Sequence, residues 1–196
     1  MKEINELVLR DSSANPGPLG LFGFGMTTVL LNLHNAGFFE INSMILAMGV
    51  FYGGTAQVIA GILESKKNNS FGMTAFISYG FFWLTLVGLI VMPKLGWVAA
   101  ASATAMACYL TMWGIFTGLL FIGTLNINRA LQFVFATLTI LFFLLAAGDA
   151  TGNKSITHFA GYEGLICGFA AIYTGAASLL NDVYGRKFWP VGTVTK

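Results

Sequence analysis

Long apolar runs alternate with short polar stretches along most of the chain. A helix needs about 20 mainly apolar residues to cross the hydrocarbon core of a bilayer. Six runs reach this length, and we expect them to span the membrane at about residues 16–39, 41–63, 71–92, 99–125, 130–148 and 156–180. The polar stretches between them are short, so successive helices become antiparallel neighbours. The pattern therefore predicts an all-α integral membrane protein with six transmembrane helices.

Polar segments flank these runs at both ends of the chain. Residues 1–14 form a polar N-terminal segment, residues 15–182 hold the six expected helices, and residues 183–196 form a C-terminal tail. The N-terminal segment lacks the short apolar stretch and the small-residue cleavage site of a signal peptide. We therefore expect the first apolar run to be retained as a span.

The composition excludes other classes of protein. Hydrophobic residues make up 56% of the chain and charged residues 9%, and the mean hydropathy is +0.75. Ordinary soluble domains carry roughly 25% charged residues, so this chain has too few charges to cover a soluble globule. Its formal net charge of +2 is too small to indicate a nucleic-acid partner. We expect contacts with membrane lipid and none with nucleic acid.

The basic residues are distributed unevenly between the two sides of the predicted bundle. Two of them, Lys94 and Lys154, fall on the side opposite the N-terminus. The other eight fall on the side of the N-terminus: Lys2, Arg10, Lys66, Lys67, Arg129, Arg186, Lys187 and Lys196. Because cytoplasmic loops of membrane proteins are enriched in Lys and Arg, we expect both termini in the cytoplasm and the protein in the inner membrane of the cell.

Several polar side chains lie inside the predicted spans. Thr28, Asn32 and Asn35 are spaced i, i+4 and i+7, which places them on one helical face together with Phe24. Gln57 lies within the second span. No predicted span carries a central Lys, Arg or Asp, as a voltage sensor or a cation pump requires. Amides and hydroxyls suit a narrow pathway for a small polar solute, and we expect Asn32, Asn35 and Gln57 to contact it.

Four titratable residues near the span ends need separate interpretations. His34 and His158 are either interfacial hydrogen bonders or members of a proton relay. Glu163, about two turns into the sixth span, either faces a wet vestibule or takes part in proton coupling. Glu64, which lies beside two lysines, is expected to be a solvated helix end.

Neither a metal site nor an enzyme active site is indicated. Cys108 and Cys167 lie inside apolar runs without metal-type spacing, and we interpret both as small packing residues. The sequence contains no HExxH motif or comparable catalytic cluster. We therefore expect no catalytic residue, no metal and no cofactor.

Small residues recur at helical spacing in two of the predicted spans. Gly49 and Gly53 form a GxxxG motif in the second span, and Gly164, Gly168 and Ala171 form a stripe in the sixth. Such stripes let helix backbones approach closely. Each stripe is therefore either a packing surface or part of the lining of a lumen.

The first span opens with the motif NPGPLGL at residues 15–21. Asn15 is a suitable N-cap, and Pro16 and Pro18 fall in the first turn, where a missing N–H group removes no hydrogen bond. The free N–H groups of a helix start also favour a nearby anion. The motif is either a helix cap alone or an anion site as well. Its defining residues are Asn15, Pro16, Pro18, Leu19, Gly20 and Leu21.

This motif resembles the NPAPLGL signature of the acetate uptake transporters, the succinate–acetate permease family, with Gly17 in place of alanine. The likeness continues through GFGMTTVLLNLHNAGFF, AMGVFYGGTAQVIAG, TAFISYGFFWLTL, LQFVFATLTILF and HFAGYEGLICG, and it covers about residues 14–190. The long N-terminal signature makes the resemblance specific.

The resemblance implies six-helix protomers that assemble as hexamers, with a pathway for acetate, succinate and related short carboxylates through each protomer. It also implies a hydrophobic constriction formed by Phe24, Tyr79 and Leu138, and a position tied to substrate size at Ala171. Glu163 departs from the family pattern, in which an apolar residue is expected at this position.

These observations together predict a proton-coupled transporter for acetate and other short carboxylates. A passive anion channel and a channel for another small solute such as ammonium remain as alternatives. A membrane-embedded enzyme or an assembly scaffold is a further alternative of a different class. It is disfavoured because an enzyme needs a catalytic cluster and a scaffold needs no aligned polar faces within several spans.

Overall fold

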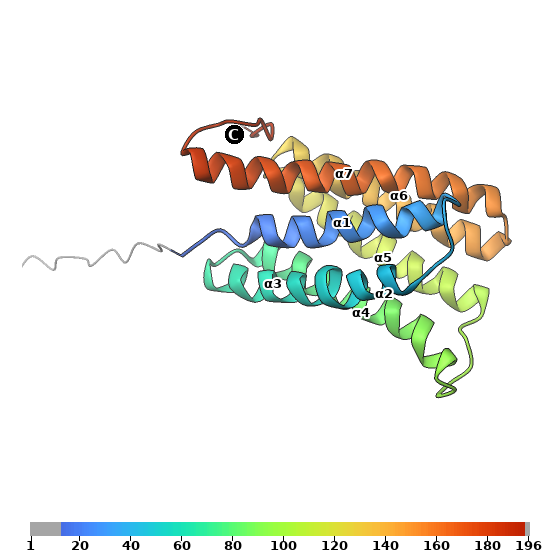
Figure 1. Ribbon diagram of the computed structural model, residues 1–196. Helices are drawn as coiled ribbons and strands as arrows, with labels where there is room; N and C mark the ends of the chain where they lie inside the picture. Colours follow the sequence, from blue (N-terminus) through green and yellow to red (C-terminus); the bar gives the residue numbers. More distant parts are fainter. Residues whose placement is uncertain (1–12, 195–196) are drawn as a thin grey trace, which may run out of the picture.

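The computed structural model describes residues 13–194, and this part of the chain forms a bundle of long helices (Figure 1). In chain order the helices are α1 (Gly17–Asn35), α2 (Ser43–Ala47), η1 (Met48–Ala56), α3 (Gln57–Lys66), α4 (Ser70–Lys94), α5 (Ala103–Thr124), α6 (Arg129–Thr151) and α7 (Lys154–Tyr184). Helices α2, η1 and α3 follow one another without a break and form one rod, Ser43–Lys66. The described residues therefore form six rods.

Five of the six rods are long and apolar enough to cross a bilayer. The rod that does not meet this criterion is α1, whose last turns carry Asn32, His34 and Asn35. In Figure 1, α1 (blue) runs between α7 and α3 in the middle of the bundle. Its neighbours are α7 on one side and the rod Ser43–Lys66 on the other. A membrane crossing by α1, and hence the number of six spans, stays a prediction.

The six rods close into a ring. The rod Ser43–Lys66 packs against both α1 and α4, and α6 packs against both α5 and α7. Helix α1 also packs extensively against α7, which brings the first and the last rod together. Aromatic stacking of Phe82 on Tyr109, with ring centroids 5.9 Å apart, joins α4 to α5. The interior of this ring contains the cavities described below.

Three of the predicted boundaries differ from the observed ones by four residues, and one of them is the start of the fourth span, predicted at residue 99 and observed at Ala103 of α5. The sequence predicts a first span that continues to residue 39, but α1 ends at Asn35 and the chain turns at Gly37, whose φ is +87°. A residue with positive φ cannot continue a right-handed helix. The sequence also predicts that the sixth span ends at residue 180, but α7 continues to Tyr184. Gly185 provides the left-handed C-cap there.

Helices α1 and α7 touch through their backbones. A Cβ atom added to Gly25 would lie 2.8 Å from the carbonyl oxygen of Gly168 and 2.9 Å from the backbone nitrogen of Ile172. A Cβ atom on Gly164 would overlap the side chain of Asn32. The small stripe of the sixth span is therefore a packing surface against α1, which is one of the two roles that the sequence allows.

The middle of the rod Ser43–Lys66 is a π-helix, η1, over Met48–Ala56. Gly53 in this segment lies against Thr27 and Trp83, where an added Cβ atom would come within 2.9 Å of both side chains. The side-chain nitrogen Nε2 of Gln57 donates to the Gly53 carbonyl at 2.6 Å. π-Helical segments are rare and are frequently found at functional sites. No feature of the sequence analysis predicts this one.

The C-terminal tail folds back onto the bundle. The backbone nitrogens of Phe188 and Trp189 donate to Asn181 Oδ1 at 2.7 and 2.9 Å, and the Trp189 ring stacks on Tyr173. The Arg129 backbone nitrogen donates to the Gly192 carbonyl at 2.8 Å. The described part of the tail is therefore anchored at the end of the bundle where α1 and α6 begin.

Basic residues are concentrated at that same end. Lys66, Lys67 and Arg129 lie at the ends of α3 and α6 there, whereas Lys94 and Lys154 lie at the opposite end. Arg186 and Lys187 follow the end of α7 and join the first group, while Lys2, Arg10 and Lys196 lie outside the described residues. The arrangement agrees with the predicted charge bias. The cytoplasmic location of both termini stays a prediction.

The contact between α1 and α7 yields a stability prediction. Gly25→Ala is expected to destabilise the protein by about 1–3 kcal/mol, because the new methyl group forces two helix backbones apart. The matched control is Gly88→Ala on α4, where an added Cβ atom meets nothing within 4 Å. There the better helix propensity of alanine leaves stability unchanged or slightly raised. Thermal unfolding of both variants in detergent measures the difference, and equal midpoints would contradict the packing argument.

Candidate functional site

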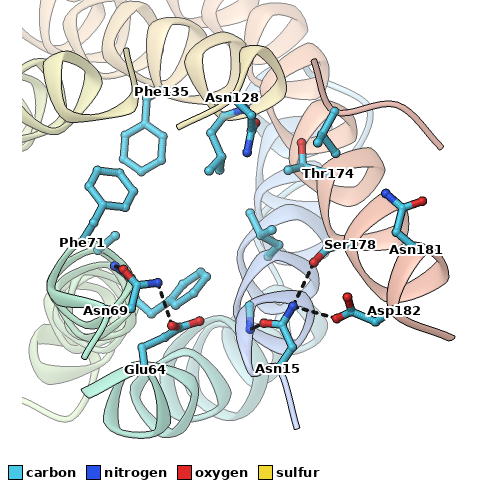
Figure 2. Close-up of a pocket in the computed structure, with 17 residues that line it drawn as sticks. Asn15, Glu64, Asn69, Phe71, Asn128, Phe135, Thr174, Ser178, Asn181 and Asp182 are labelled. Carbon is cyan, nitrogen blue, oxygen red and sulfur yellow. Dashed lines mark hydrogen bonds between the residues drawn. The ribbon is translucent and has the colours of Figure 1, made fainter. Parts of the chain in front are cut away.

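A vestibule of about 320 Å³ opens at the end of the bundle where α1 begins and α7 ends (Figure 2). Its rim is polar and is formed by Asn15, Glu64, Asn69, Asn128, Asn181 and Asp182. Its floor is apolar and includes Leu21, Ala75, Phe76 and Phe135. The vestibule therefore narrows from a polar mouth to a hydrophobic floor inside the ring of helices.

Two small cavities continue inward from that floor. The near cavity, of about 20 Å³, shares Leu21, Ala75, Phe76 and Phe135 with the vestibule. The far cavity, also of about 20 Å³, shares Phe24 and Leu138 with the near cavity. A water molecule needs at least about 10–15 Å³, so each cavity is the size of one water molecule. In this conformation neither can hold a carboxylate.

A distal pocket of about 340 Å³ opens at the opposite end of the bundle. Its lining includes His34, Asn35, Lys154 and His158. Asn35 Nδ2 donates to Asn32 Oδ1 at 3.0 Å, and Asn32 lines the far cavity. The vestibule and the two small cavities share lining residues one with the next, and the distal pocket lies beyond them without a shared lining residue; we refer to these four cavities as the row.

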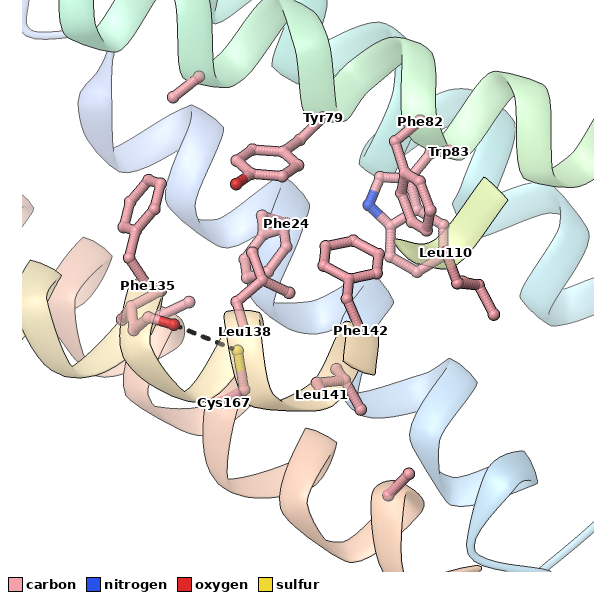
Figure 3. Packing of buried hydrophobic residues seen from close by; sticks show 14 of the residues in the cluster. Phe24, Tyr79, Phe82, Trp83, Leu110, Phe135, Leu138, Leu141, Phe142 and Cys167 are labelled. Atoms are coloured by element: carbon pink, nitrogen blue, oxygen red, sulfur yellow. Dashed lines mark hydrogen bonds between the residues drawn. The ribbon is translucent and has the colours of Figure 1, made fainter. Parts of the chain in front are cut away.

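Phe24, Tyr79 and Leu138 meet between the near and the far cavity, although they come from α1, α4 and α6 (Figure 3). All three side chains are buried, and the ring centroids of Phe24 and Tyr79 lie 5.8 Å apart. The hydroxyl of Tyr79 donates to Thr117 Oγ1 at 2.9 Å, which fixes the ring from the side of α5. The three residues that the family resemblance singles out thus lie together beside the two water-sized cavities of the row.

The predicted solute-contacting amides also lie along the row. Gln57 lines the near cavity, Asn32 lines the far cavity, and Asn35 lines the distal pocket. Since Gln57 Nε2 donates to the Gly53 carbonyl, its oxygen Oε1 is the free end of the amide, buried and without a hydrogen-bond partner among residues 13–194. Ala171 is fully buried against the core and lines none of these four cavities.

Residues of the NPGPLGL motif build the edge of the vestibule. The N-cap position of α1 is Pro16 and not Asn15 as predicted, yet Asn15 Oδ1 still accepts from the Gly17 backbone nitrogen at 3.0 Å. The side-chain nitrogen of Asn15 donates to Asp182 Oδ2 at 2.8 Å and so ties the start of α1 to the end of α7 (Figure 2). Leu21 lines both the vestibule and the near cavity.

The remaining motif residues have packing roles. Pro18 and Gly20 are buried, and Gly20 packs against the ring of Phe76, where a Cβ atom would overlap the ring. Leu19 is 37% exposed and faces away from the vestibule lining. The motif therefore serves as more than a helix cap, because it places α1 against α4 and α7 at the mouth of the row.

The three predicted proton-coupling residues lie in two different places. His34 and His158 both line the distal pocket, and His34 Nδ1 donates to the Phe39 carbonyl at 2.9 Å. Glu163 lines none of the four cavities. Both of its carboxylate oxygens are buried and have no hydrogen-bond partner in the part of the chain that the structure describes. The histidines are on the row of cavities and Glu163 is beside it.

Glu64 is a residue that the sequence analysis misjudged. It is only 4% exposed, and its Oε2 accepts from Asn69 Nδ2 at 2.7 Å at the vestibule wall (Figure 2). Gly72 lies directly against its side chain, since a Cβ atom there would be 2.9 Å from Glu64 Cδ. The glycine lets α4 close over the carboxylate. The two lysines beside Glu64 in the sequence suggested an exposed carboxylate. The prediction is wrong because the burial of Glu64 depends on this contact between two helices.

The vestibule carries negative charge without a basic counterpart. Glu64 and Asp182 contribute carboxylates, and among the described residues that line the vestibule no Lys, Arg or His is found. The searched residues contain no group of three or more His, Cys, Asp or Glu side chains that could hold a metal ion. The hydrogen-bond donors offered to a solute at this mouth are therefore amides and hydroxyls.

Comparison with known proteins assigns the chain to a family. Residues 5–187 match the family described as GPR1/FUN34/yaaH. The chain is 59% identical over 179 residues to the succinate-acetate/proton symporter SatP of Escherichia coli K12, covering 91% of this chain and 95% of the relative. It is 34% identical to acetate permease A of Emericella nidulans, covering 86% of this chain and 62% of that longer protein.

A solved structure supports the same conclusion. The structure reported as the bacterial acetate channel SatP superposes with a TM-score of 0.91 and 58% sequence identity, and covers 92% of this chain and 100% of that chain. The all-α bundle described above is thus that of an integral, multi-pass membrane protein. With the match over residues 5–187 and these similarities, the chain belongs to the GPR1/FUN34/yaaH family.

Proposed function

We propose that the protein carries acetate and other short carboxylates such as succinate across the inner membrane of the cell, coupled to protons, through the row of cavities in each protomer. The observation that carries this proposal is the row itself, which is interrupted by the apolar side chains of Phe24, Tyr79 and Leu138. Its support from relatives is the 59% identity to a protein named as a succinate-acetate/proton symporter. No enzymatic step is part of the proposal.

The apolar constriction acts as the gate of this pathway. A solute that leaves the vestibule must lose water before it reaches Phe24, and desolvating a charged carboxylate is unfavourable unless polar groups replace the water. Gln57 before the constriction and Asn32 behind it offer amide groups for this purpose. Because both adjoining cavities are of water size, the ring must widen by side-chain movement before acetate passes.

The charge of the vestibule favours coupling to protons over passage of the bare anion. Two like unit charges 4 Å apart repel by about 1 kcal/mol in water and about 4 kcal/mol near a protein surface. Acetate anion meets such repulsion from Glu64 and Asp182, whereas neutral acetic acid does not. A neutral acid can also donate its O–H group to the free Oε1 of Gln57, which an anion cannot do.

A passive anion channel is the second candidate function. The observation that favours it is the relative of 58% identity whose structure is reported as an acetate channel. In both candidates the solute follows the same row of cavities. They differ in whether a proton accompanies the carboxylate, and His34 and His158 in the distal pocket are the residues that we assign to proton coupling, ahead of Glu163.

Assembly into a homo-oligomer, a hexamer by family resemblance, is part of the proposal. Large apolar side chains are exposed on the outer faces of the rods, including Phe51 at 73% and Phe159 at 63%. In the membrane such faces contact lipid or neighbouring copies of the chain. The row of cavities lies between the helices of one chain, so we place one pathway in each protomer.

Flux of labelled acetate into liposomes that contain the purified protein tests the proposed function. The expected result is uptake that follows an imposed pH gradient and does not respond to the membrane potential. Uptake that follows the potential instead would identify the anion channel. Empty liposomes provide the baseline for acetic acid that crosses lipid unaided, and uptake no faster than that baseline would contradict both candidates.

Leu138→Ala is expected to widen the constriction and to raise succinate flux relative to acetate flux several-fold, because the ring then excludes the larger solute less strictly. Leu110→Ala provides the matched control. Leu110 is a buried leucine of the same hydrophobic cluster that lines none of the four cavities. Equal selectivity in the two variants at equal protein abundance would place the constriction elsewhere.

His34→Gln and His158→Gln are expected to weaken the response of acetate uptake to the pH gradient, whereas Glu163→Gln leaves it unchanged. The physical reason is position, since both histidines line the distal pocket and Glu163 lies beside the row. Initial rates at several external pH values measure the response. If only Glu163→Gln weakened the response of acetate uptake to the pH gradient, the proton-coupling residue would be Glu163 and not a histidine.

A further inference from the structure

A lateral pocket of about 530 Å³ lies outside the row, between the first turns of α6, the later turns of α7 and the C-terminal tail. Phe133 of α6 and Tyr173 of α7 line it and are both exposed, so it opens toward the surroundings of the bundle. Thr174 and Val191 line both this pocket and the vestibule, and they therefore form the wall between the two. Its volume falls within the range of roughly 300–1,000 Å³ that is usual for ligand pockets.

The C-terminal tail closes one side of the lateral pocket and pairs with the start of α6. The carbonyl groups of Gly192 and Val191 accept from the backbone nitrogens of Arg129 and Ala130 at 2.8 and 3.0 Å. The next N–H group of α6, that of residue 131, donates to Asn128 Oδ1 at 2.8 Å. These first N–H groups of the helix are therefore already paired, and an anion in the lateral pocket must be bound by a side chain.

Arg129 supplies that side chain. A guanidinium group has five N–H donors, and one of them is used, because Arg129 Nη1 donates to Gln132 Oε1 at 2.8 Å. Gln132 is itself held in place, since its Nε2 donates to the carbonyls of Thr124 and Leu125 at 3.3 Å. Among the described residues that line the lateral pocket there is no Asp or Glu. Arg129 is therefore a positioned cation without a carboxylate partner in the pocket.

The two sides of the shared wall differ in charge. The vestibule side has the carboxylates of Glu64 and Asp182 and no basic residue among its described lining, whereas the lateral side has Arg129 and no acidic one. Opposite charges attract and like charges repel most strongly where little water screens them. An anion is therefore favoured in the lateral pocket and disfavoured in the vestibule, so the lateral pocket is not a further station of the proposed pathway.

The lateral pocket lies at the depth of the lipid head groups. Helix α6 has 23 residues and begins at Arg129. Its length of about 34 Å slightly exceeds the hydrocarbon core of about 30 Å, which places its first residue in the head-group region. The rings of Tyr173 and Trp189 stack beside the pocket with centroids 5.5 Å apart. Tyrosine and tryptophan are enriched at the interface between membrane and water, so these rings indicate the same depth.

An apolar surface continues from the lateral pocket toward the middle of the membrane. On α6 the exposed residues Phe133 and Ile140 are spaced i and i+7, and on α7 the exposed residues Ile166 and Phe169 are spaced i and i+3. Each pair therefore lies on one face of its helix. Helices α6 and α7 pack against each other, and the small side chain of Ala170 lines the pocket between them. A basic group thus lies at the outer end of an apolar groove.

We propose that the lateral pocket binds one anionic phospholipid, whose phosphate group pairs with Arg129 and whose acyl chain lies along the apolar groove between α6 and α7. Arginine binds phosphate with two parallel hydrogen bonds, and basic pockets between membrane helices are typical sites for anionic head groups. A soluble anion pairs with Arg129 but leaves the groove uncovered. A phospholipid with a neutral head group covers the groove but brings no net charge to Arg129. An anionic phospholipid satisfies both parts.

Thermal unfolding of the purified protein in detergent tests the site independently of transport. Added phosphatidylglycerol is expected to raise the unfolding midpoint in a saturable manner, and phosphatidylcholine with the same acyl chains is expected to raise it less. Arg129→Gln is expected to raise the phosphatidylglycerol concentration for the half-maximal shift about tenfold, because it removes the hydrogen bonds between two charged groups. An equal response of the unmodified protein to both lipids, or no response to either, would overturn the proposal.

Arg186→Gln is the matched control. Arg186 is an exposed arginine at the same end of the bundle, and it does not line the lateral pocket. Its substitution removes the same charge and is expected to leave the half-maximal concentration of phosphatidylglycerol unchanged. An equal effect of Arg129→Gln and Arg186→Gln would show a general attraction of anionic lipid to the basic end of the bundle, and would overturn the proposed site.

Two further measurements separate the lipid from a free anion and from a failure to fold. Glycerol phosphate, which carries the phosphate group without acyl chains, is expected to leave the unfolding midpoint unchanged, and a shift equal to that of phosphatidylglycerol would overturn the lipid as occupant. Ala170→Leu fills the groove and leaves Arg129 in place. It is expected to weaken phosphatidylglycerol binding several-fold, and it decides the question if Arg129→Gln fails to fold. Unchanged binding in Ala170→Leu would overturn the proposal.

Discussion

Where Gly25 of α1 meets Gly168 of α7, two helix backbones come into contact, and this contact sets how closely α1 lies against α7. It holds α1, whose last turn is polar, in its place in the ring between α7 and the rod Ser43–Lys66. From this central place α1 contributes Phe24 to the constriction and Thr28 and Asn32 to the cavity behind it. A single methyl group at the contact would displace all three. The stability of the bundle and the geometry of the pathway therefore rest on the same glycines.

Many polar groups in the bundle form hydrogen bonds within their own helix, because a buried polar group without a partner is unfavourable in the absence of water. Most threonines of α5, α6 and α7 satisfy their hydroxyls within their own helices. Gln57, Thr28 and Trp83, which lie on either side of the constriction, each keep one unpaired atom. Among the described residues, Thr27 and Glu163 also have buried unpaired atoms but line none of the four cavities, so three of these five residues lie along the proposed pathway. Unpaired buried groups lower the stability of the resting protein, but they can form hydrogen bonds with a solute during permeation.

Part of the site could be predicted before the structure was known. The i, i+4, i+7 spacing correctly placed Asn32 and Asn35 on one continuous polar face. Phe24, Tyr79 and Leu138 were named through family resemblance alone, because nothing in their spacing distinguishes them from core residues of the same type. Glu64 was misjudged, since its burial arises from Gly72 on another helix. The free donors of Trp83 and Thr28 could not be inferred at all.

The sequence by itself determined the helical class, the order of the rods and their approximate limits, because these follow from local hydrophobic runs, helix caps and the shortness of the loops. It located the small-residue stripes of the second and the last rod but left open whether each packs against a helix or lines a lumen. Only the tertiary structure decided which residues meet, where the cavities lie, and which hydroxyls and N–H groups remain unpaired. The physical reason is that helical periodicity acts over a few residues, whereas α1, α4 and α6 supply the gate from positions as far apart as Phe24 and Leu138. Contacts between such residues exist only once the helices have packed.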